Sequence, residues 1–141
     1  LTGTFLMVRE SLPHLLATTS GVIINFASTS AFFAHPYMAA YAATKGAIAS
    51  FTHSVALEYA RQGLRAVNIV PGGITSGITN TTPQNLPADT DWSLLEHLGA
   101  PLNDGRMGRP EDVAGVIAML ISDDGAFITG TEIRIDGGAH T

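Results

Sequence analysis

Tyr41 and Lys45 stand four residues apart, a spacing that suits proton transfer. Both fall near the start of a predicted helix, where side chains four residues apart project from the same face. Lys45 is the only lysine of the chain. An ammonium group beside a phenol favours the ionised form of the phenol, which makes it a usable acid and base. Taken alone, the pair is equally consistent with a solvent-exposed lysine beside a packed tyrosine.

Ser28 supplies a hydroxyl for the same chemistry, thirteen residues before Tyr41. It follows a predicted strand, and ligands of open α/β sheets bind at the carboxyl ends of the strands. A serine at such a point is able to hydrogen-bond a substrate carbonyl. A lone serine there is more simply a turn or helix-cap residue, so its interpretation depends on the pair that follows it.

Hydrophobic periodicity predicts the elements that position these residues. Apolar residues at helical spacing indicate helices over residues 2–16, about 41–61, and from Pro110 onward. Runs of β-branched and apolar residues indicate buried strands over residues 22–27, 64–70 and 132–136. This alternation predicts an α/β fold in which helices cover both faces of a doubly wound parallel sheet. Three strands are few for such a sheet, so we expect another piece of chain to cover its edges.

The stretch between Ile74 and Met107 has no clear period and is rich in Thr, Pro, Asn and Asp. Long irregular stretches inside compact domains usually serve as lids or binding loops. We therefore predict one domain over residues 1–141, with a substrate lid at about 74–107.

The composition disfavours several classes of protein. Of 141 residues, 45% are hydrophobic and 13% charged, which suits one folded domain. A net charge of -5 without a basic cluster disfavours nucleic-acid and membrane partners. The chain has no cysteine and no visible signal peptide, so a cytoplasmic location is expected. The first residue is Leu1, and a missing initiator methionine suggests a fragment or a processed product.

Several motifs of the chain, in this order and spacing, resemble those of the short-chain dehydrogenase/reductase family. The motifs are Ser28, Tyr41-Ala42-Ala43-Thr44-Lys45, Asn68-Ile69-Val70-Pro71-Gly72, Gly108-Arg109-Pro110-Glu111-Asp112-Val113-Ala114, Thr129-Gly130 and Asp136-Gly137-Gly138. The resemblance runs from Leu1 to Gly138 and implies the catalytic, C-terminal half of a Rossmann-like fold.

The resemblance implies an NAD- or NADP-dependent oxidoreductase that interconverts a ketone and a secondary alcohol. Tyr41 would be the general acid that protonates the substrate oxygen, or the base in the reverse direction. Lys45 would hold the nicotinamide ribose and favour the Tyr41 phenolate. Ser28 would stabilise the developing alkoxide. The helix over 41–61 would pack against a second subunit in a homodimer or homotetramer.

Further residues would form the nicotinamide site. Pro71, Gly72 and Gly73 would turn the chain beneath the nicotinamide, and the backbone of Ile74 would bond its carboxamide. Ser76 stands where the family commonly has a threonine, so its hydroxyl would contact the diphosphate. Without Tyr41, the Pro-Gly-Gly sequence would be read as a plain turn.

Two departures from the family pattern limit the interpretation. No G-x-G sequence occurs, so the phosphate-binding glycine loop is absent from the chain. The family's catalytic asparagine, counted back from Gly3, would fall just before Leu1. The alternative hypothesis is therefore a non-catalytic fragment that acts only as an interaction piece or an incomplete domain. The chain lacks the G-x-S-x-G sequence expected of a serine hydrolase, which disfavours that class. Enoyl reductases of the same family usually have a wider spacing between tyrosine and lysine, so ketone reduction is favoured over enoyl reduction.

The histidines show no metal-ligand pairing on a shared helix face, so no metal site is predicted. His35 lies between Ser28 and Tyr41 and is close enough in sequence to reach a substrate pocket. The neighbouring aromatic residues Phe32, Phe33 and Tyr37 would line that pocket or pack in the core.

Overall fold

The computed structural model describes residues 1–140, and all their side chains except those at positions 80, 82, 83, 97 and 103. Four α-helices and three strands follow one another along the chain: α1 (Thr2–Leu16), β1 (Val22–Phe26), α2 (Ala39–Tyr59), β2 (Arg65–Pro71), α3 (Gly77–Asn85), α4 (Pro110–Ile121) and β3 (Thr131–Ile135). The strands pair in parallel in the order β1-β2-β3, with Val22 opposite Arg65 and Val67 opposite Thr131.

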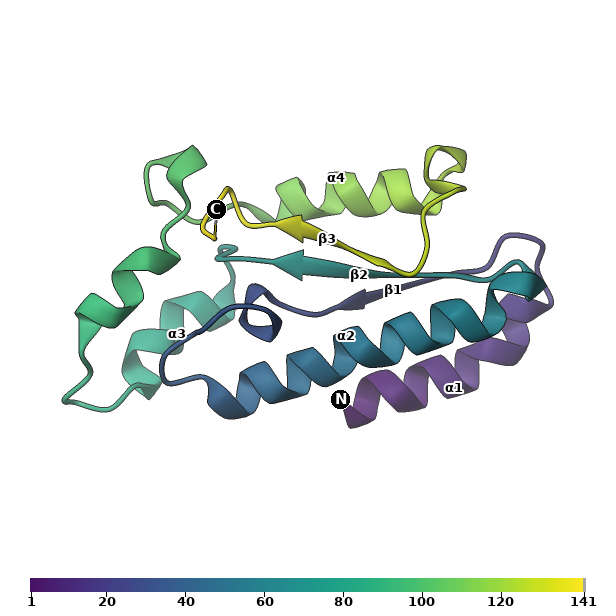
Figure 1. Ribbon diagram of the computed structural model, residues 1–141. Helices are drawn as coiled ribbons and strands as arrows, with labels where there is room; N and C mark the ends of the chain where they lie inside the picture. The colour runs from purple at the N-terminus through teal and green to yellow at the C-terminus, as the bar shows by residue number, and fades with distance from the viewer. Residues whose placement is uncertain (141) are drawn as a thin grey trace.

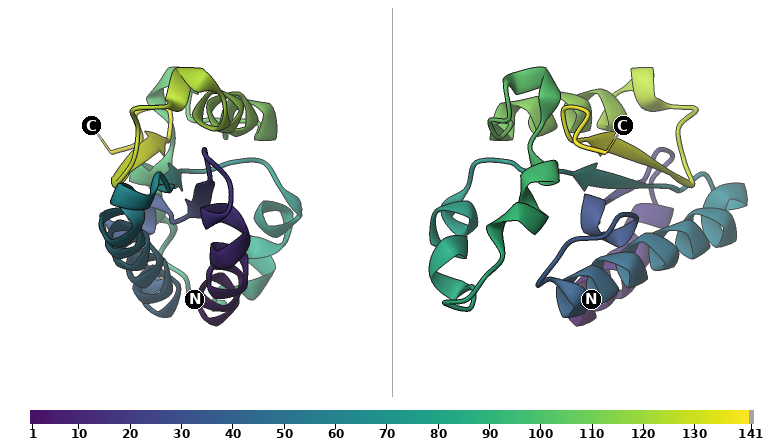
Figure 2. Two further views of the ribbon diagram at one scale, coloured as in Figure 1. Left: turned by 90° about the vertical axis from the view of Figure 1, so that its right-hand side faces the viewer. Right: turned by 60° about the vertical axis from the view of Figure 1, so that its left-hand side comes forward.

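Helices cover both faces of this sheet, as Figures 1 and 2 show. In Figure 1, α1 and α2 lie below the sheet and α4 lies above it. All three arrowheads point toward the end of the molecule where α3 lies, so α3 stands beyond the carboxyl ends of the strands. The arrangement is part of a doubly wound, Rossmann-like α/β fold, as the sequence predicts.

The central strand β2 forms the core, because its residues from Ala66 to Val70 are almost completely buried. On the lower face, β-strand side chains meet the apolar sides of α1 and α2, including Val8 and Val55. On the upper face, Val67 and Ile69 pack against Val113 and Leu120 of α4. A strand buried on both faces requires an apolar run without alternation, which is the pattern of this segment.

The predicted elements agree with the observed ones to within about two residues. Helix α2 begins at Ala39 rather than Tyr41, and a short 3-10 turn, Ala60–Gln62, continues it. Gly63 then ends the helical segment with a φ of 81°, a conformation that glycine adopts without strain. Strand β2 is displaced by one residue, because Pro71 still pairs with Ile135 of β3.

The stretch from Ile74 to Met107 is more regular than its sequence suggests. It contains α3 and two 3-10 segments, Trp92–Leu98 and Pro101–Asn103. Threonine, proline and asparagine are poor helix formers in an interior position, so periodicity did not reveal α3. At its N-terminus, the Ser76 N–H donates to the Thr79 hydroxyl over 2.9 Å, which satisfies one backbone donor there.

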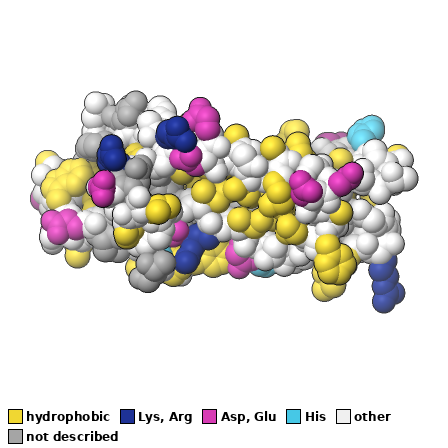
Figure 3. Space-filling view, turned by 90° about the horizontal axis from the view of Figure 1, so that it is seen from above, with side chains coloured by type: hydrophobic (Ala, Val, Ile, Leu, Met, Phe, Trp, Pro, Cys, Tyr) yellow, Lys and Arg dark blue, Asp and Glu magenta, His cyan; other side chains and the backbone are white. Residues whose placement is uncertain are grey.

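Apolar side chains also reach the surface. Seen from above, the face over α4 carries a band of hydrophobic side chains near its middle (Figure 3). Ile121, at the end of α4, and Phe127, in the following turn, are among the exposed large hydrophobic residues. None of the helices in the described part of the chain is both long and apolar enough to cross a membrane.

Candidate functional site

Tyr41 and Lys45 lie on the same face of the first two turns of α2, as their spacing predicts. The Lys45 Nζ is 5.6 Å from the centre of the Tyr41 ring. Tyr41 is 47% exposed, whereas Lys45 is partly buried. Burial lowers the pKa of the Lys45 ammonium below its ordinary value. A partly desolvated cation acts more strongly on its neighbour than an exposed one, because less water screens it.

The position of Lys45 is fixed by the end of β1. Its Nζ donates a 2.8 Å hydrogen bond to the backbone carbonyl of Phe26, the last residue of the strand. The ammonium has two further hydrogens. One of its three donors is therefore used to hold the side chain, and two remain for other acceptors.

Ser28 follows β1 directly and caps the 3-10 turn Thr29–Ala31. Its backbone is extended, with φ -169° and ψ 157°, and its Oγ accepts a 3.2 Å bond from the N–H of Ser30. An extended cap residue turns its hydroxyl toward the following N–H groups. This is the turn-serine role that the sequence left open. The accepted bond leaves the hydroxyl hydrogen of Ser28 as a donor for another group.

The strand register brings Ser28 level with Pro71. Phe26 pairs with Ile69, and Ser28 and Pro71 each lie two residues beyond that pair on adjacent parallel strands. Ala27 continues the ladder by donating to the Ile69 carbonyl over 2.9 Å. Because the carboxyl ends of parallel strands meet at one edge, Ser28 and the Pro71 turn share that edge of the sheet.

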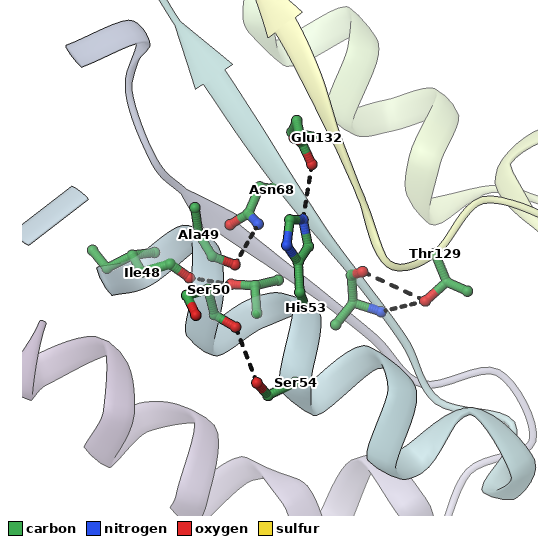
Figure 4. A network of polar contacts seen from close by, with 10 residues as sticks. Ile48, Ala49, Ser50, His53, Ser54, Asn68, Thr129 and Glu132 are labelled. Carbon is green, nitrogen blue, oxygen red and sulfur yellow. Dashed lines mark hydrogen bonds and ion pairs between the residues drawn. The ribbon is translucent and has the colours of Figure 1, made fainter. Parts of the chain in front are cut away.

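A buried polar network, part of which Figure 4 shows, ties α2 to β1 and β2. Asn25 of β1 donates to the Thr52 hydroxyl over 2.9 Å, and Thr52 donates to the Ile48 carbonyl. Asn68 of β2 donates to the Ala49 carbonyl over 3.1 Å. These bonds join two strands to the middle of the helix whose first turns carry Tyr41 and Lys45. The sequence signal for them is a polar residue inside an apolar strand run, which occurs in both β1 and β2.

The Pro71-Gly72-Gly73 turn passes very close to the end of β3. The Gly72 N–H donates to the Ile135 carbonyl over 2.9 Å, and a Cβ added at Gly72 would lie 2.7 Å from the Cβ of Asp136. Only glycine fits at that distance. Asp136-Gly137-Gly138, after β3, and Pro71-Gly72-Gly73, at the end of β2, therefore pack against each other at the same edge of the sheet.

Ile74 forms an isolated parallel bridge with Gly108, just before α4. The bridge uses the Gly73 carbonyl and the Thr75 N–H, at 2.9 Å each. In a parallel pairing, the N–H and C=O of the central residue point to the opposite side. The Ile74 backbone groups therefore face away from Gly108, as a backbone that bonds a ligand would require.

The predicted site residues lie in two places, the start of α2 and the turn after β2. Lys45 is hydrogen-bonded to Phe26 at the end of β1, and its ammonium lies near the Tyr41 ring. Pro71, Gly72, Gly73 and Ile74 form the turn at the end of the next strand. Ser76 stands further on, exposed, as the residue before α3.

Comparison with known proteins identifies the family of this chain. A family model described as enoyl-(acyl carrier protein) reductase matches residues 1–140. The chain is 39% identical, over 97% of its length and 53% of the relative's, to 2-(S)-hydroxypropyl-CoM dehydrogenase 3 of Xanthobacter autotrophicus. It is 40% identical to a protein of the same organism named inactive 2-(S)-hydroxypropyl-CoM dehydrogenase 2, over 97% of the chain and 59% of that relative.

Among solved structures, the chain is similar to a 3-ketoacyl-(acyl-carrier-protein) reductase from Brucella melitensis complexed with NADH. The TM-score is 0.82 at 31% identity, over 99% of this chain and 54% of that one. The chain thus spans about half the length of the relatives it matches. It belongs to the short-chain dehydrogenase/reductase family and corresponds to the C-terminal portion of its members.

Proposed function

We propose that this chain carries the proton-transfer half of an NAD(P)-dependent oxidoreductase that interconverts a ketone and a secondary alcohol. The observation that carries the proposal is the Tyr41-Lys45 pair, held to the end of β1 by the bond between Lys45 and Phe26. A phenol beside a desolvated cation, at the carboxyl edge of a parallel sheet, is positioned for acid-base chemistry.

Each residue of the pair has a separate task. In carbonyl reduction, the Tyr41 hydroxyl donates its proton to the substrate oxygen, and the Lys45 charge stabilises the phenolate that remains. In alcohol oxidation, the phenolate accepts the proton. Ser28 donates its hydroxyl hydrogen to the same substrate oxygen, where negative charge develops, while its lone pair keeps the bond from Ser30.

The residues present fit one end of a nicotinamide dinucleotide. Two Lys45 hydrogens remain for ribose hydroxyls, and the Ile74 backbone groups that face away from Gly108 suit a carboxamide. The absence of a side chain at Gly72 lets the turn after β2 approach Asp136 closely. When bound, the nicotinamide supplies or accepts the hydride. The glycine-rich phosphate loop is not in this sequence, so adenosine binding and the choice between NAD and NADP belong to other residues.

The names of the relatives support the substrate class. One is named as a dehydrogenase of a hydroxypropyl compound and another as a ketoacyl reductase, so the two names cover both directions of a ketone-alcohol reaction. Identity at this level does not decide catalytic competence, because a relative that is 40% identical is named as inactive. The proposal therefore depends on the tyrosine-lysine geometry and not on likeness alone.

A non-catalytic role is favoured by one observation: β1 is an edge strand of the sheet, and Phe26 at its end is 45% exposed. An open edge is a surface for pairing with another segment. Titration of the isolated chain with NADH and NADPH tests the non-catalytic role, because saturable fluorescence enhancement would contradict an inert piece. We expect weak or no binding by the isolated chain.

We also propose that the whole protein is a homo-oligomer that associates through α2. Leu57, near the end of this helix, is 83% exposed, and Met7 of the adjacent α1 is 68% exposed. Analytical ultracentrifugation of the full-length protein tests this proposal. A dimer or tetramer is expected, and Leu57→Glu should shift it toward the monomer.

The function is tested by Tyr41→Phe in the full-length protein, with Tyr59→Phe at the far end of the same helix as the matched control. Loss of a general acid costs about 10²–10⁴-fold in turnover. Tyr41→Phe should therefore lower kcat by at least two orders of magnitude and leave cofactor affinity nearly unchanged. Tyr59→Phe should behave like the wild type. A Tyr41→Phe enzyme with near-normal kcat would contradict the assignment.

A further inference from the structure

Two histidines that are far apart in the sequence meet at the carboxyl edge of the sheet. His35 lies in the loop between the 3-10 turn Thr29–Ala31 and α2, and His140 lies in the tail that follows β3. They are 105 residues apart in sequence, yet their Nε2 atoms are 3.2 Å apart. Neither the helical spacing nor any short motif of the sequence indicates this contact.

The separation of the two nitrogens matches that of two ligands on one metal ion. With zinc-nitrogen distances of about 2.0–2.1 Å, a tetrahedral ion separates two nitrogen ligands by about 3.3 Å. The observed 3.2 Å is close to this value. The Thr29 hydroxyl lies 3.3 Å from the same His35 nitrogen and adds an oxygen to the group.

Both rings are held by their surroundings. The His140 ring stacks on Phe33, with centroids 4.3 Å apart and planes 4° apart. The Arg134 guanidinium lies 5.3 Å from the Phe33 ring centre, and its Nη1 donates to the His140 carbonyl over 3.4 Å. Thr29 itself is 1% exposed. Ligands that are already positioned lose less freedom when an ion binds.

We propose that His35 and His140 form a binding site for a divalent transition-metal ion. Neutral imidazole is a preferred ligand of zinc, nickel and copper. In the described part of the chain, no group of three or more His, Cys, Asp and Glu residues gathers as a metal cluster. The site is therefore a two-imidazole one, in which water and the Thr29 hydroxyl complete the coordination, and its ion exchanges more readily than that of a four-ligand structural site.

Metal binding at this point would join the tail after β3 to the loop between Ser28 and Tyr41. Without metal, a neutral imidazole still donates a hydrogen bond to its partner, so the contact itself does not require the ion. The metal-free hydrogen bond is the competing explanation of the 3.2 Å distance.

The experiment is a calorimetric titration of the full-length, metal-free protein with zinc chloride and with nickel chloride at pH 7.5, where imidazoles are largely neutral. We expect one equivalent to bind. The substitutions are His35→Ala and His140→Ala, and His14→Ala in the exposed part of α1 is the matched control. Changes around a metal's own ligands typically cost about 10–100-fold in affinity, so loss of a ligand should weaken binding at least about 10-fold. His14→Ala should bind like the wild type.

A second measurement keeps the test valid if one variant does not fold. Electron paramagnetic resonance of the copper(II)-loaded wild-type protein should show splitting from two equivalent imidazole nitrogens, and either folded single variant should show one. The absence of saturable binding would leave the hydrogen bond as the whole explanation and overturn the proposal. Equal affinity in the wild type, His35→Ala and His140→Ala would overturn it as well, because the ion would then bind elsewhere.

Discussion

The Lys45 Nζ donates a hydrogen bond of 2.8 Å to the carbonyl of Phe26, so the second turn of α2 is tied to the last residue of β1. Phe26 is two residues before Ser28, and Lys45 is one helical turn after Tyr41. This bond between a side chain and a backbone carbonyl joins the two parts of the site directly. Since the acceptor is a backbone atom, the identity of residue 26 matters less to the site than the path of the strand.

The Ser28 hydroxyl caps a 3-10 turn and is proposed to act in catalysis, and a matched serine separates the two roles. Ser122 caps the 3-10 turn Asp123–Gly125 in the same manner, accepting from the Asp124 N–H over 3.3 Å. Replacing either serine by alanine should cost about 0.5–2 kcal/mol of stability through the lost cap.

Only Ser28→Ala should also affect turnover, by about 10²–10³-fold in the full-length enzyme, because the alkoxide loses a donor. The measurements are thermal unfolding and steady-state kinetics of both variants. Equal kinetic losses in Ser28→Ala and Ser122→Ala would exclude a catalytic role for Ser28.

Thr52 connects the buried network beneath the site. In Thr52→Val, the buried Asn25 amide loses its acceptor, so the free energy of unfolding should fall by about 1–3 kcal/mol. Ser54→Ala removes a comparable bond to a carbonyl four residues earlier on the exposed side of the same helix. It should change stability by no more than about 0.5 kcal/mol. Denaturant titration of the full-length protein measures both effects, and a neutral Thr52→Val would show that the network has no stabilising role.

Gly72 is predicted to tolerate no side chain. In Gly72→Ala the new Cβ would lie 2.7 Å from the Cβ and 3.0 Å from the Cα of Asp136, and overpacking of this kind costs about 1–3 kcal/mol. The control, Gly77→Ala at the start of α3, meets no atom within 4 Å and should leave stability unchanged or slightly raised. Thermal unfolding distinguishes the two. A Gly72→Ala protein as stable as the wild type would mean that the two strand ends can move apart.

Asp112 should give the fold an acid-sensitive contact. Its carboxylate accepts a 2.9 Å bond from the Arg109 side chain and a 2.8 Å bond from the Arg109 N–H, and these bonds hold the pKa of Asp112 below its ordinary value. A carboxyl group whose pKa is lower in the folded state stabilises the protein above its unfolded-state pKa of about 3.9. This stabilisation disappears as the pH falls through the folded-state pKa.

Asp112→Asn should therefore be less stable than the wild type at neutral pH, and the difference should close below about pH 3 to 4. Glu111→Gln is the control, because it removes a charge from the same helical turn but keeps both bonds to Arg109. Unfolding curves measured from pH 2 to 7 provide the comparison. A stability difference that does not change with pH would show that the bonds to Arg109 do not depend on the charge of Asp112.

The elements that carry the site follow from local sequence patterns, and the elements that surround it do not. An apolar run buried on both faces predicted β2, and a proline followed by acids predicted the start of α4. Helix α3 was not predicted, because its sequence, GITNTTPQN, has no apolar stripe at helical spacing.

Contacts between residues far apart in the sequence were not predicted either. The sequence placed Tyr41 and Lys45 on one face but gave no indication that Phe26 would be the lysine's acceptor, because a backbone carbonyl has no sequence signature. The contact of His35 with His140 joins residues 105 positions apart, which no local pattern encodes.

The order of the strands along the chain affects how the protein is made. Strand β2 lies between β1 and β3, and β3 is formed by Thr131–Ile135, close to the end of this sequence. Both pairings are parallel and join distant residues, a topology of high contact order that folds slowly. During synthesis, β2, whose central residues are almost completely buried in the fold, leaves the ribosome long before β3 exists. We therefore expect the nascent chain to expose β2 and to need chaperone protection until β3 is translated.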